Sequence, residues 1–225
     1  MNEICDLYAQ AQQLEEAGTH VVSTDEMTGV QALEHIYPNK LPLPGMSATM
    51  EFEYVRHGTT SLIGFFNVAA GSLYPPFLNP TRNEEDFCRA VRDVLNTDPQ
   101  ASWIFINDGL NTHKSESLVR LVAEACSLDL ELGVKGKSGV LKNMDTRTAF
   151  LHDPSHRIRF VYTPKHSSWM NQIEIWFSII NRKLLKRKSY LSVGELEASI
   201  RKFISQYNLT AHPFKWTYAG VPLVV

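Results

Sequence analysis

The sequence predicts an α/β domain built on a mixed central sheet, in which antiparallel strands come first and alternating strands and helices follow. Short runs rich in Val, Ile, Phe and Trp alternate with stretches of helical periodicity. The length of 225 residues suits one domain with a substantial core. Hydrophobic residues make up 44% of the chain and charged residues 20%, which is ordinary for a globular protein. We therefore expect a single mixed sheet flanked by helices.

The N-terminal half is expected to supply one helix and the antiparallel strands. A short helix covers about residues 1–19 and precedes a strand at 20–25, within the domain that runs over 20–225. A connector follows that should be irregular, because it contains three prolines: Pro38, Pro42 and Pro44. Apolar and acidic side chains alternate over residues 50–54, which predicts a half-exposed strand. Gly58 and Thr59 predict a turn from there into a second antiparallel strand.

The C-terminal half is expected to alternate strands with helices. Branched and aromatic residues predict strands at 103–107 and 158–162. A basic excursion into solvent, rich in Gly, Lys and Ser, is expected at about residues 131–150. Helical periodicity and capping residues predict helices over these ranges: 83–97 with Asn83 or Thr81 as cap, 114–127, 168–187, and 193–208 with Ser192 as cap.

One carboxylate lies on an otherwise apolar helix. The apolar residues of that helix recur at helical spacing and form one face: Ile173, Trp176, Phe177, Ile180 and Leu184. Glu174 lies roughly 100° around the helix from Ile173, at the border of this face. Burying a charge is costly unless it is paired or binds a metal ion. From this helix alone, a metal ligand and a glutamate in water are equally good interpretations.

Two aspartates add weight to the metal-ligand interpretation. Asp25 closes the run H-V-V-S-T-D and Asp108 closes the run S-W-I-F-I-N-D, so each is expected where a strand ends. In sheets covered by helices, functional groups gather just beyond the carboxyl ends of the strands. A single such aspartate is more often a helix cap or a turn residue. Together with Glu174, the two aspartates form a set of oxygen ligands that suits Mg²⁺.

Four segments in chain order resemble the catalytic domain of bacterial insertion-sequence transposases in the mariner-like superfamily, which are DDE endonucleases with an Asp-Asp-Glu active site. The segments are V-V-S-T-D-E-M-T-G-V-Q-A-L-E (21–34), Y-V-R-H-G-T (54–59), F-I-N-D-G-L-N-T-H-K-S (105–115) and Y-T-P-K-H-S-S-W-M-N-Q-I-E-I-W-F (162–177). The resemblance implies a ribonuclease-H-like fold. It also implies that Asp25, Asp108 and Glu174 are the catalytic ligands of Mg²⁺ or Mn²⁺, with two ions per active site. Glu26 is a competing carboxylate, but strand alternation turns it to the face opposite Asp25.

The activity that the resemblance implies is DNA strand cleavage at transposon ends, followed by attack of the freed 3′-hydroxyl on target DNA. The implied partners are double-stranded DNA and a second copy of the chain assembled on that DNA. Two departures from the family pattern bear on this activity. Sixty-five residues separate Asp108 from Glu174, more than in many relatives, and only about twenty residues precede the first strand, where relatives carry a helix-turn-helix module. We therefore expect either a separately encoded module or a fragment of a longer transposase.

Three alternatives remain open from the sequence. The chain could be a ribonuclease-H-like nuclease that hydrolyses DNA without strand transfer. It could also be a truncated fragment that only binds DNA or a partner, although its triad is intact. A small-molecule metallohydrolase is disfavoured, because histidines are not grouped as ligands and the basic segment of the chain would then serve no purpose.

The net charge of −2 conceals a strong asymmetry along the chain. Residues 1–134 carry seven Lys and Arg against nineteen Asp and Glu, whereas residues 135–188 carry twelve against three. A basic block this dense is typical of surfaces that bind phosphate backbones, whereas a helix C-terminus alone is complemented by two or three cations. The residues expected to contact DNA are Lys135, Lys137, Lys142, Arg157, Arg159, Lys165, His166, Arg182, Lys183, Lys186, Arg187 and Lys188.

Two asparagines are expected to support the site. Asn171 shares a polar stripe with Glu174 and is predicted to orient that carboxylate. Asn111 follows Asp108 and is predicted either to cap a helix or to reach the substrate.

The sequence also argues against membrane association. No apolar run approaches the length that spans a bilayer, and the acidic N-terminus is unlike a signal peptide. Cys5, Cys88 and Cys126 are odd in number and lack metal-ligand spacing, which is typical of reduced thiols. We therefore expect a cytoplasmic protein that associates with the nucleoid when it is bound to DNA.

Overall fold

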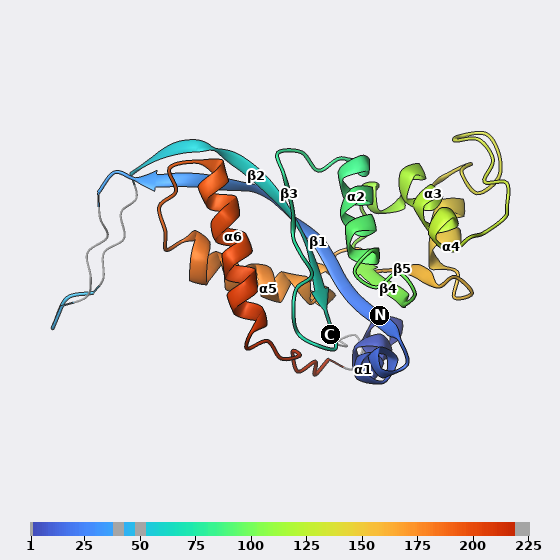
Figure 1. The fold of residues 1–225 in the computed structure, drawn as a ribbon, viewed down its shortest axis with the longest axis horizontal. Helices are drawn as coiled ribbons and strands as arrows, with labels where there is room; N and C mark the ends of the chain where they lie inside the picture. The colour runs from blue at the N-terminus through green and yellow to red at the C-terminus, as the bar shows by residue number, and fades with distance from the viewer. Residues whose placement is uncertain (1, 38–42, 48–52, 219–225) are drawn as a thin grey trace.

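A five-stranded mixed sheet organises the computed structural model, which describes residues 2–37, 43–47 and 53–218 (Figure 1). From one edge to the other, the strands are β3 (Phe77–Asn79), β2 (Tyr54–Asn67), β1 (Thr19–His35), β4 (Ser102–Asn107) and β5 (Ile158–Tyr162). The β3–β2 and β2–β1 pairs are antiparallel, and the β1–β4 and β4–β5 pairs are parallel. The expected mixed sheet, with its antiparallel strands first in the chain, is confirmed.

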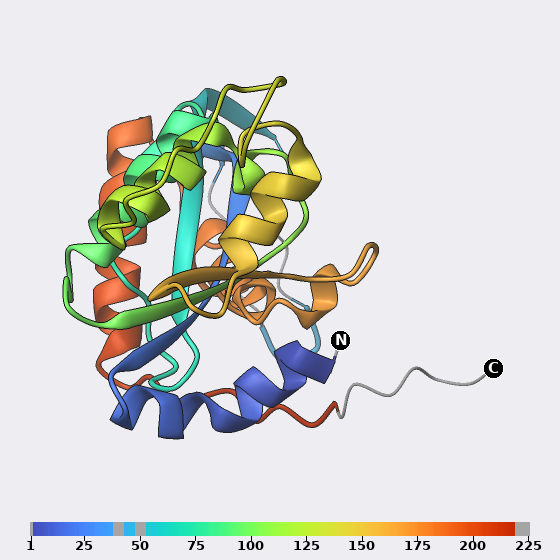
Figure 2. The same ribbon diagram turned by 90° about the vertical axis from the view of Figure 1, so that its right-hand side faces the viewer.

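Helices cover both faces of this sheet. Within the described residues the α-helices are α1 (Asn2–Glu16), α2 (Glu84–Leu95), α3 (Glu116–Ala125), α4 (Met144–His152), α5 (Ile173–Ile180) and α6 (Val193–Asn208). Three short elements accompany them: the 3₁₀ turns η1 (Thr112–Lys114) and η2 (Ser168–Met170), and the π-helical turn η3 (Asn181–Leu185). Figure 2 shows α4 on one side of β4 and β5 and α1 on the other. None of the described helices is long and apolar enough to cross a membrane.

Strand alternation divides the core into two layers. Val21 and Ile106 pack with α1, α5 and α6, whereas Val22 and Phe105 pack with α2, α3 and α4. On the second face, the rings of Phe105 and Phe160 stack across the β4–β5 pair with their centroids 5.0 Å apart. This packing fixes the register of the two parallel strands, and the register decides which residues follow the strands at their carboxyl ends.

β1 continues ten residues beyond Asp25, so the prediction of a strand that ends at residue 25 was wrong. The irregularity in the pairing between Met27 and Val30 is a bulge, and Gly29 adopts a φ of +62° within it. Glycine tolerates this left-handed conformation without steric cost, so the strand resumes after the bulge. The turn-like residues that follow Asp25 therefore mark a bulge and not the end of the strand.

β2 is likewise continuous through Gly58, and the predicted turn at Gly58 and Thr59 was wrong. Gly58 adopts a φ of +111° beside a second irregularity in the β1–β2 register. Tyr54 is the first residue of β2. Residues 50–52 of the expected half-exposed strand lie outside the described residues together with Pro38 and Pro42, and Glu53 is described but belongs to no strand.

The other predicted elements of the C-terminal half are largely confirmed. α2 begins after its cap Asn83, α6 begins after its cap Ser192, and β4 and β5 lie where expected. The predicted helix at 168–187 is divided into η2, α5 and η3. The basic excursion is exposed over most of residues 131–143, but Asn143 then caps α4. The sequence did not predict α4, because its apolar residues form no continuous face.

A buried carboxylate, Asp86, ties β3 and the following loop to α2. Its side chain is 2% exposed and accepts hydrogen bonds from Thr81 Oγ1 at 2.5 Å, Asn79 Nδ2 at 3.0 Å and Asn83 N at 3.2 Å, and it also contacts Arg89. Burial raises the pKa of this carboxyl, but the hydrogen bonds outweigh burial and hold the pKa below its ordinary value. The fold is therefore built around the ionised form.

We expect Asp86→Asn to lower the free energy of unfolding by about 1–3 kcal/mol at pH 7. Because folding lowers the pKa of Asp86, its stabilisation is present above the pKa of the unfolded carboxyl and is lost as the pH falls. The gap between variant and wild type should therefore shrink below about pH 4 in urea-unfolding experiments. Asp93→Asn, an exposed position on the same helix, should leave stability unchanged at every pH. A gap for Asp86→Asn that is equal at all pH values would contradict an ionic role.

Candidate active site

Asp25 and Asp108 lie on neighbouring parallel strands. Ser23 of β1 pairs with Ile106 of β4, and each aspartate comes two residues after its member of this pair. β4 ends at Asn107, so Asp108 follows a strand end as predicted, whereas Asp25 lies within β1. The two carboxylates are close enough that the charge of Asp108 raises the pKa of Asp25.

α5 packs directly onto the sheet beside Asp25. Gly64 of β2 is the partner of Asp25 in the antiparallel pair. A Cβ atom at Gly64 would lie 3.1 Å from side-chain atoms of both Ile173 and Phe177, which is tighter than ordinary contact, so a larger residue would push these side chains of the helix away from the sheet. Glu174 follows Ile173 and is thereby brought to the same region as the two aspartates.

Glu174 occupies the first turn of α5 and is exposed. Its carboxylate has no hydrogen-bond or ion-pair partner among the described residues. Desolvation raises the pKa of this carboxyl, and the negative charge of Asp108 raises it further. Asp108 therefore influences the ionisation of both Glu174 and Asp25, so the three carboxylates belong to one electrostatic site.

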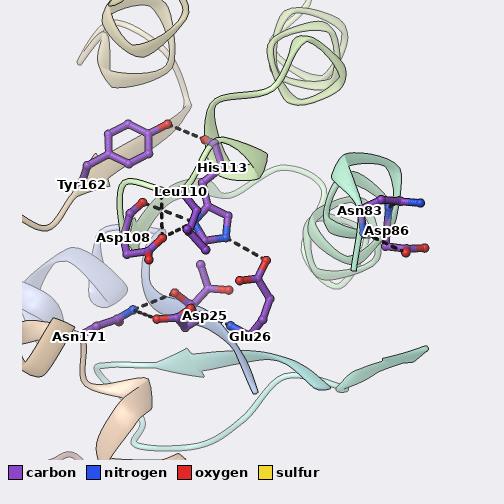
Figure 3. A network of polar contacts seen from close by, with 10 residues as sticks. Asp25, Glu26, Asn83, Asp86, Asp108, Leu110, His113, Tyr162 and Asn171 are labelled. Atoms are coloured by element: carbon purple, nitrogen blue, oxygen red, sulfur yellow. Dashed lines mark hydrogen bonds and ion pairs between the residues drawn. The ribbon is translucent and has the colours of Figure 1, made fainter. Parts of the chain in front are cut away.

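Asp25 is the most deeply buried of the three carboxylates, at 7% exposure. It accepts hydrogen bonds from Glu26 N at 2.8 Å and from Asn171 Nδ2 at 3.3 Å (Figure 3). Burial raises the pKa of Asp25 to about 7, and the hydrogen bond from Glu26 N offsets this only in part. A buried carboxylate that faces a like charge is costly to ionise unless a cation joins it.

Asn171 holds Asp25 and not Glu174. Its fully buried amide donates from Nδ2 to Thr24 O at 2.9 Å as well as to Asp25, and its Oδ1 accepts a hydrogen bond from Ser23 Oγ. The prediction that Asn171 orients Glu174 was wrong because Asn171 lies in the extended link between η2 and α5. Its side chain therefore reaches down to β1 and does not continue the polar stripe of the helix.

The loop that follows β4 holds Asp108 in place. His113 Nδ1 lies 2.8 Å from Asp108 Oδ1, and Leu110 N donates to the same oxygen at 3.0 Å. The other ring nitrogen of His113, Nε2, lies 3.1 Å from Glu26 Oε1 (Figure 3). Burial lowers the pKa of His113, but its hydrogen bonds to Asp108 and Glu26 raise it to about 9. Burial raises the pKa of Asp108, whereas His113, Leu110 N and the charge of Lys114 hold it below its ordinary value.

The chain is similar to a known protein family and to solved structures. The family model of the DDE superfamily endonucleases matches residues 20–197. The chain belongs to this family. The matched range contains all three carboxylates, and the family resemblance inferred from the four sequence segments is confirmed. No curated protein matches the chain in sequence.

The fold of this DDE endonuclease is shared with structures of Mos1 transposase. The chain is similar to the Mos1 paired-end complex with the left transposon end, with a TM-score of 0.54, 13% identity, and coverage of 94% of this chain and 54% of that chain. It is also similar to the Mos1 mariner paired-end complex with Mn (TM-score 0.53, 11% identity, 91% and 54% covered). The similarity to the catalytic domain of Mos1 mariner transposase has a TM-score of 0.50 and 12% identity, and it covers 94% of this chain and 80% of that chain. The ribonuclease-H-like fold is thereby confirmed, and the chain spans about half the length of the first two proteins.

The donor set of this DDE endonuclease fits a hard divalent cation. All three side chains offer carboxylate oxygens, which Mg²⁺ and Mn²⁺ prefer. Among the described residues, no three His, Cys, Asp or Glu side chains are gathered closely enough to hold a metal ion as they stand. Three negative charges without a cation repel one another, and Asp108 Oδ1 is already engaged by His113. The raised pKa values of Asp25 and Glu174 reflect a site that a cation would stabilise.

The basic residues within 135–188 are close in the sequence but lie on separate parts of the fold. The loop over residues 131–143 lies beside α3 and α4, whereas residues 182–188 follow α5 toward the opposite end of the molecule (Figure 1). Lys135 in the loop lies 3.8 Å from the carboxylates of Glu84 and Glu116, so its charge is partly compensated. The sequence therefore predicted the presence of basic charge but not its division between separate surfaces.

The side chains expected to contact DNA differ in whether they already have hydrogen-bond or ion-pair partners. Arg182 and Arg187 donate to backbone carbonyls within η3 and the residues beside it, and Lys188 contacts Ser199 and Glu195. Within the described ranges, the following are exposed and have no hydrogen-bond or ion-pair partner for their side chains: Lys137, Lys142, Lys165, His166, Lys183 and Lys186.

Two arginines have structural partners instead. Arg157 donates from Nη1 to Ala101 O at 2.6 Å and from Nη2 to Ala125 O at 2.7 Å. Arg159 Nη1 lies 3.1 Å from Glu3 Oε1 of α1. Both residues lie toward the start of β5, whereas Asp108 follows the opposite end of the parallel neighbour β4. We therefore leave Arg157 and Arg159 out of the proposed DNA-binding surface.

The side chain of Asn111 makes no capping hydrogen bond, although the residue immediately precedes η1. It is exposed, so a contact between Asn111 and the substrate stays a prediction, while the capping role was wrong. Lys165 and His166 lie in the loop between β5 and η2, and His166 adopts the left-handed backbone conformation with a φ of +61°.

Sequence reasoning missed three residues around Asp108. The sequence did not predict the contact of His113 with Asp108, and it offered Glu26 only as a rival of Asp25. Lys114, whose Nζ lies 4.4 Å from the centroid of the Tyr162 ring, was not considered. Strand alternation predicted that Glu26 faces away from Asp25, but the sequence carried no signal for which residue would meet it there.

We expect Asn171→Ala to lower the free energy of unfolding by about 1–3 kcal/mol, because it leaves buried hydrogen-bonding groups of Ser23 and Thr24 without their partner. Asn111→Ala is the matched control, since its exposed side chain makes no capping bond. The control should change stability by less than about 0.5 kcal/mol. Urea unfolding of both variants measures the difference. Equal values for the two would contradict the bridging role of Asn171.

Proposed function

We propose that this chain is the catalytic domain of a transposase that cleaves DNA strands at transposon ends and transfers the 3′-hydroxyl ends into target DNA. Asp25, Asp108 and Glu174 are its catalytic residues and metal ligands. The observation that carries the proposal is the shared electrostatic site of the three carboxylates on β1, β4 and α5, within a chain of the DDE superfamily endonucleases. Membership of the family alone would leave the residues unassigned.

The proposed cofactor is Mg²⁺ or Mn²⁺, with two ions per active site. Asp25, Asp108 and Glu174 would hold the ions through their carboxylate oxygens. Support comes from the carboxylate donor set and from the Mn that accompanies the Mos1 paired-end complex of the same fold. Bound ions of this kind activate a nucleophilic oxygen and stabilise the leaving oxygen of a phosphodiester.

The residues of the chain would prepare the site for this chemistry. Asn171 fixes the Asp25 carboxylate from the α5 side of the sheet, and the loop after β4 fixes Asp108. Lys114, Lys165 and His166 come from the loops that follow β4 and β5, where cationic side chains would bind the phosphates beside the scissile bond. Since no protein nucleophile is involved, the serine and cysteine residues have no covalent role in this proposal.

The proposed partner is double-stranded DNA, both transposon ends and target. The exposed cations of the 131–143 loop and of residues 182–188 supply electrostatic attraction for the backbone. Mos1, which shares the fold, is described as a paired-end complex with its left transposon end. We further propose that two copies of the chain assemble on DNA, that a helix-turn-helix module encoded separately or elsewhere in a longer chain recognises the ends, and that the protein acts in the cytoplasm at the nucleoid.

We expect Asp108→Asn and Glu174→Gln each to reduce cleavage of DNA carrying the flanking inverted repeats by at least about 100-fold, because each removes a ligand of the ions that stabilise the transition state. Duplex binding should remain within a few-fold of wild type in a gel-shift assay. Chelation by EDTA should abolish cleavage by the wild type. Glu16→Gln, an exposed carboxylate on α1, is the matched control and should cleave normally. Equal loss of binding and cleavage would contradict the catalytic assignment.

The same assay with pre-cut ends separates the transposase from a nuclease. A transposase joins the 3′-hydroxyl of a pre-cut end to a target plasmid. A hydrolytic ribonuclease-H-like nuclease would cleave but never join, and a fragment that only binds DNA would do neither.

We expect the double variant Lys183→Ala with Lys186→Ala to bind duplex DNA less tightly and to lower the slope of log K against log salt by about 2, since each lysine would neutralise one phosphate. Fluorescence anisotropy over a salt series measures both quantities. Lys202→Ala with Lys215→Ala removes the same charge from exposed lysines outside the basic segment. An equal change in slope for both double variants would show that residues 182–188 are not a specific phosphate-binding surface.

A further inference from the structure

A buried polar chain runs behind Asp108, from the carboxylate of Glu26 through the ring of His113. The side chains of Glu26 and His113 are 1% and 0% exposed, whereas that of Asp108 is 25% exposed. Figure 3 shows His113 between the two carboxylates, with Glu26 and Asp25 side by side on β1 but turned apart. This line of side chains therefore links the interior on the α2 and α3 face of the sheet to a partly exposed carboxylate of the candidate active site.

Both nitrogens of the His113 ring are engaged. Nδ1 lies 2.8 Å from Asp108 Oδ1, and Nε2 lies 3.1 Å from Glu26 Oε1. Each ring nitrogen therefore faces an oxygen of a different carboxylate. Nδ1 also lies within hydrogen-bond distance of the backbone oxygen of Asp108, at 3.3 Å, and contacts at opposite edges of a planar ring leave it little freedom to rotate.

The surroundings of His113 fix it further. Tyr162 Oη donates to His113 O at 2.8 Å, and the ring of Phe87 packs against the imidazole with a centroid separation of 4.4 Å. Since Tyr162 is the last residue of β5 and Phe87 belongs to α2, elements on both sides hold His113 in place. His113 is thus a rigid part of the scaffold and not a mobile loop side chain.

The two carboxylate oxygens of Asp108 differ in their partners. His113 Nδ1 and Leu110 N both engage Oδ1, and no described residue engages Oδ2. The carboxylate therefore has one oxygen anchored to the loop and one that remains available. An anchored carboxylate presents its free oxygen to a cation in a fixed direction. Groups that hydrogen-bond to a metal ligand generally orient the ligand in this way.

Glu26 has a single side-chain partner in this arrangement. Its Oε1 faces His113, and its buried Oε2 has no hydrogen-bond partner among the described residues. A buried carboxylate with a hydrogen-bond partner at only one oxygen lowers the stability of the fold, which suggests that Glu26 has a functional role. The only group that Glu26 orients, in the part of the chain that the structure describes, is the His113 ring.

We propose that Glu26 and His113 form a positioning pair, in which Glu26 orients the imidazole and the imidazole anchors Asp108 Oδ1 so that Oδ2 is presented to the catalytic metal ion. Neither residue touches the metal or the DNA. The proposal rests on the proposed function, because it takes Asp108 as a metal ligand.

Two substitutions of His113 separate positioning from packing. The amide nitrogen of asparagine occupies the place of Nδ1, so His113→Asn keeps a donor for Asp108 and loses Glu26. The amide nitrogen of glutamine occupies the place of Nε2, so His113→Gln keeps the contact with Glu26 and loses Asp108. Both remove the same ring from Phe87, and both should therefore shift the midpoint of thermal unfolding equally.

We expect Mn²⁺ titrations of the DNA-free protein, followed by electron paramagnetic resonance, to give about 10–100-fold weaker binding for His113→Gln, and for His113→Asn a loss of no more than about threefold. The Glu26 pair supplies a second comparison. Glu26→Gln keeps an acceptor for Nε2 and should bind Mn²⁺ nearly as the wild type does, whereas Glu26→Ala should lose affinity. Equal Mn²⁺ affinity for asparagine and glutamine at position 113 would overturn the proposal.

A measurement on the unaltered protein covers the case in which these variants fail to fold. In protein labelled with ¹⁵N-histidine, the Nδ1–H group of His113 should be visible and protected from exchange, and Mg²⁺ should shift the Nδ1 resonance. An Nδ1 that carries no proton would overturn the proposal. Mn²⁺ binding by Asp108→Asn distinguishes failure of the positioning-pair proposal from failure of the proposed function. If Asp108→Asn binds Mn²⁺ like the wild type, the metal-ligand assignment itself is wrong, whereas a loss confined to Asp108→Asn rejects the positioning pair alone.

Discussion

The parallel pairing of β1 with β4 is the constraint on which the site depends. Its register sets Ser23 opposite Ile106, and this alignment brings Asp25 and Asp108 together on neighbouring strands. The stacked aromatic core between β4 and β5 and the layers of helices on both faces keep that register from slipping. A shift of one residue would turn Asp25 into the opposite core and separate the two carboxylates.

The proximity of these carboxylates makes their negative charges repel each other, and the surrounding residues stabilise the two aspartates to different extents. Asp25 is buried, keeps two neutral donors, and has a raised pKa. Asp108 is held ionised by His113 and by the backbone of its loop. One aspartate is thus stabilised by the protein, and the other gains most from a bound cation. This asymmetry supports a metal-dependent chemistry and would couple metal binding to the order of the site.

Glycine positions make the arrangement possible at two points. Gly64 lets α5 approach the sheet closely enough to bring Glu174 beside the aspartates. Gly29 permits the bulge through which β1 continues past Asp25 to pair with the full length of β2. A side chain at Gly64 would press against Ile173 and Phe177, and one at Gly29 would strain the left-handed backbone there. The effect would reach the active site, although neither glycine carries a functional group.

The sequence by itself determined the family, the mixed sheet, and most of the elements of its C-terminal half, and it predicted the three candidate carboxylates. Those features follow from local patterns: strand composition before Asp108, helical spacing around Glu174, and caps at Asn83 and Ser192. Tertiary structure alone decided that β1 runs on through its bulge, that Asn171 serves Asp25, and that Arg157 and Arg159 bind within the fold. It also decided that Glu26 meets His113 in the interior. Each of these depends on a contact between residues distant in the chain, and periodicity and spacing along the chain report only on near neighbours.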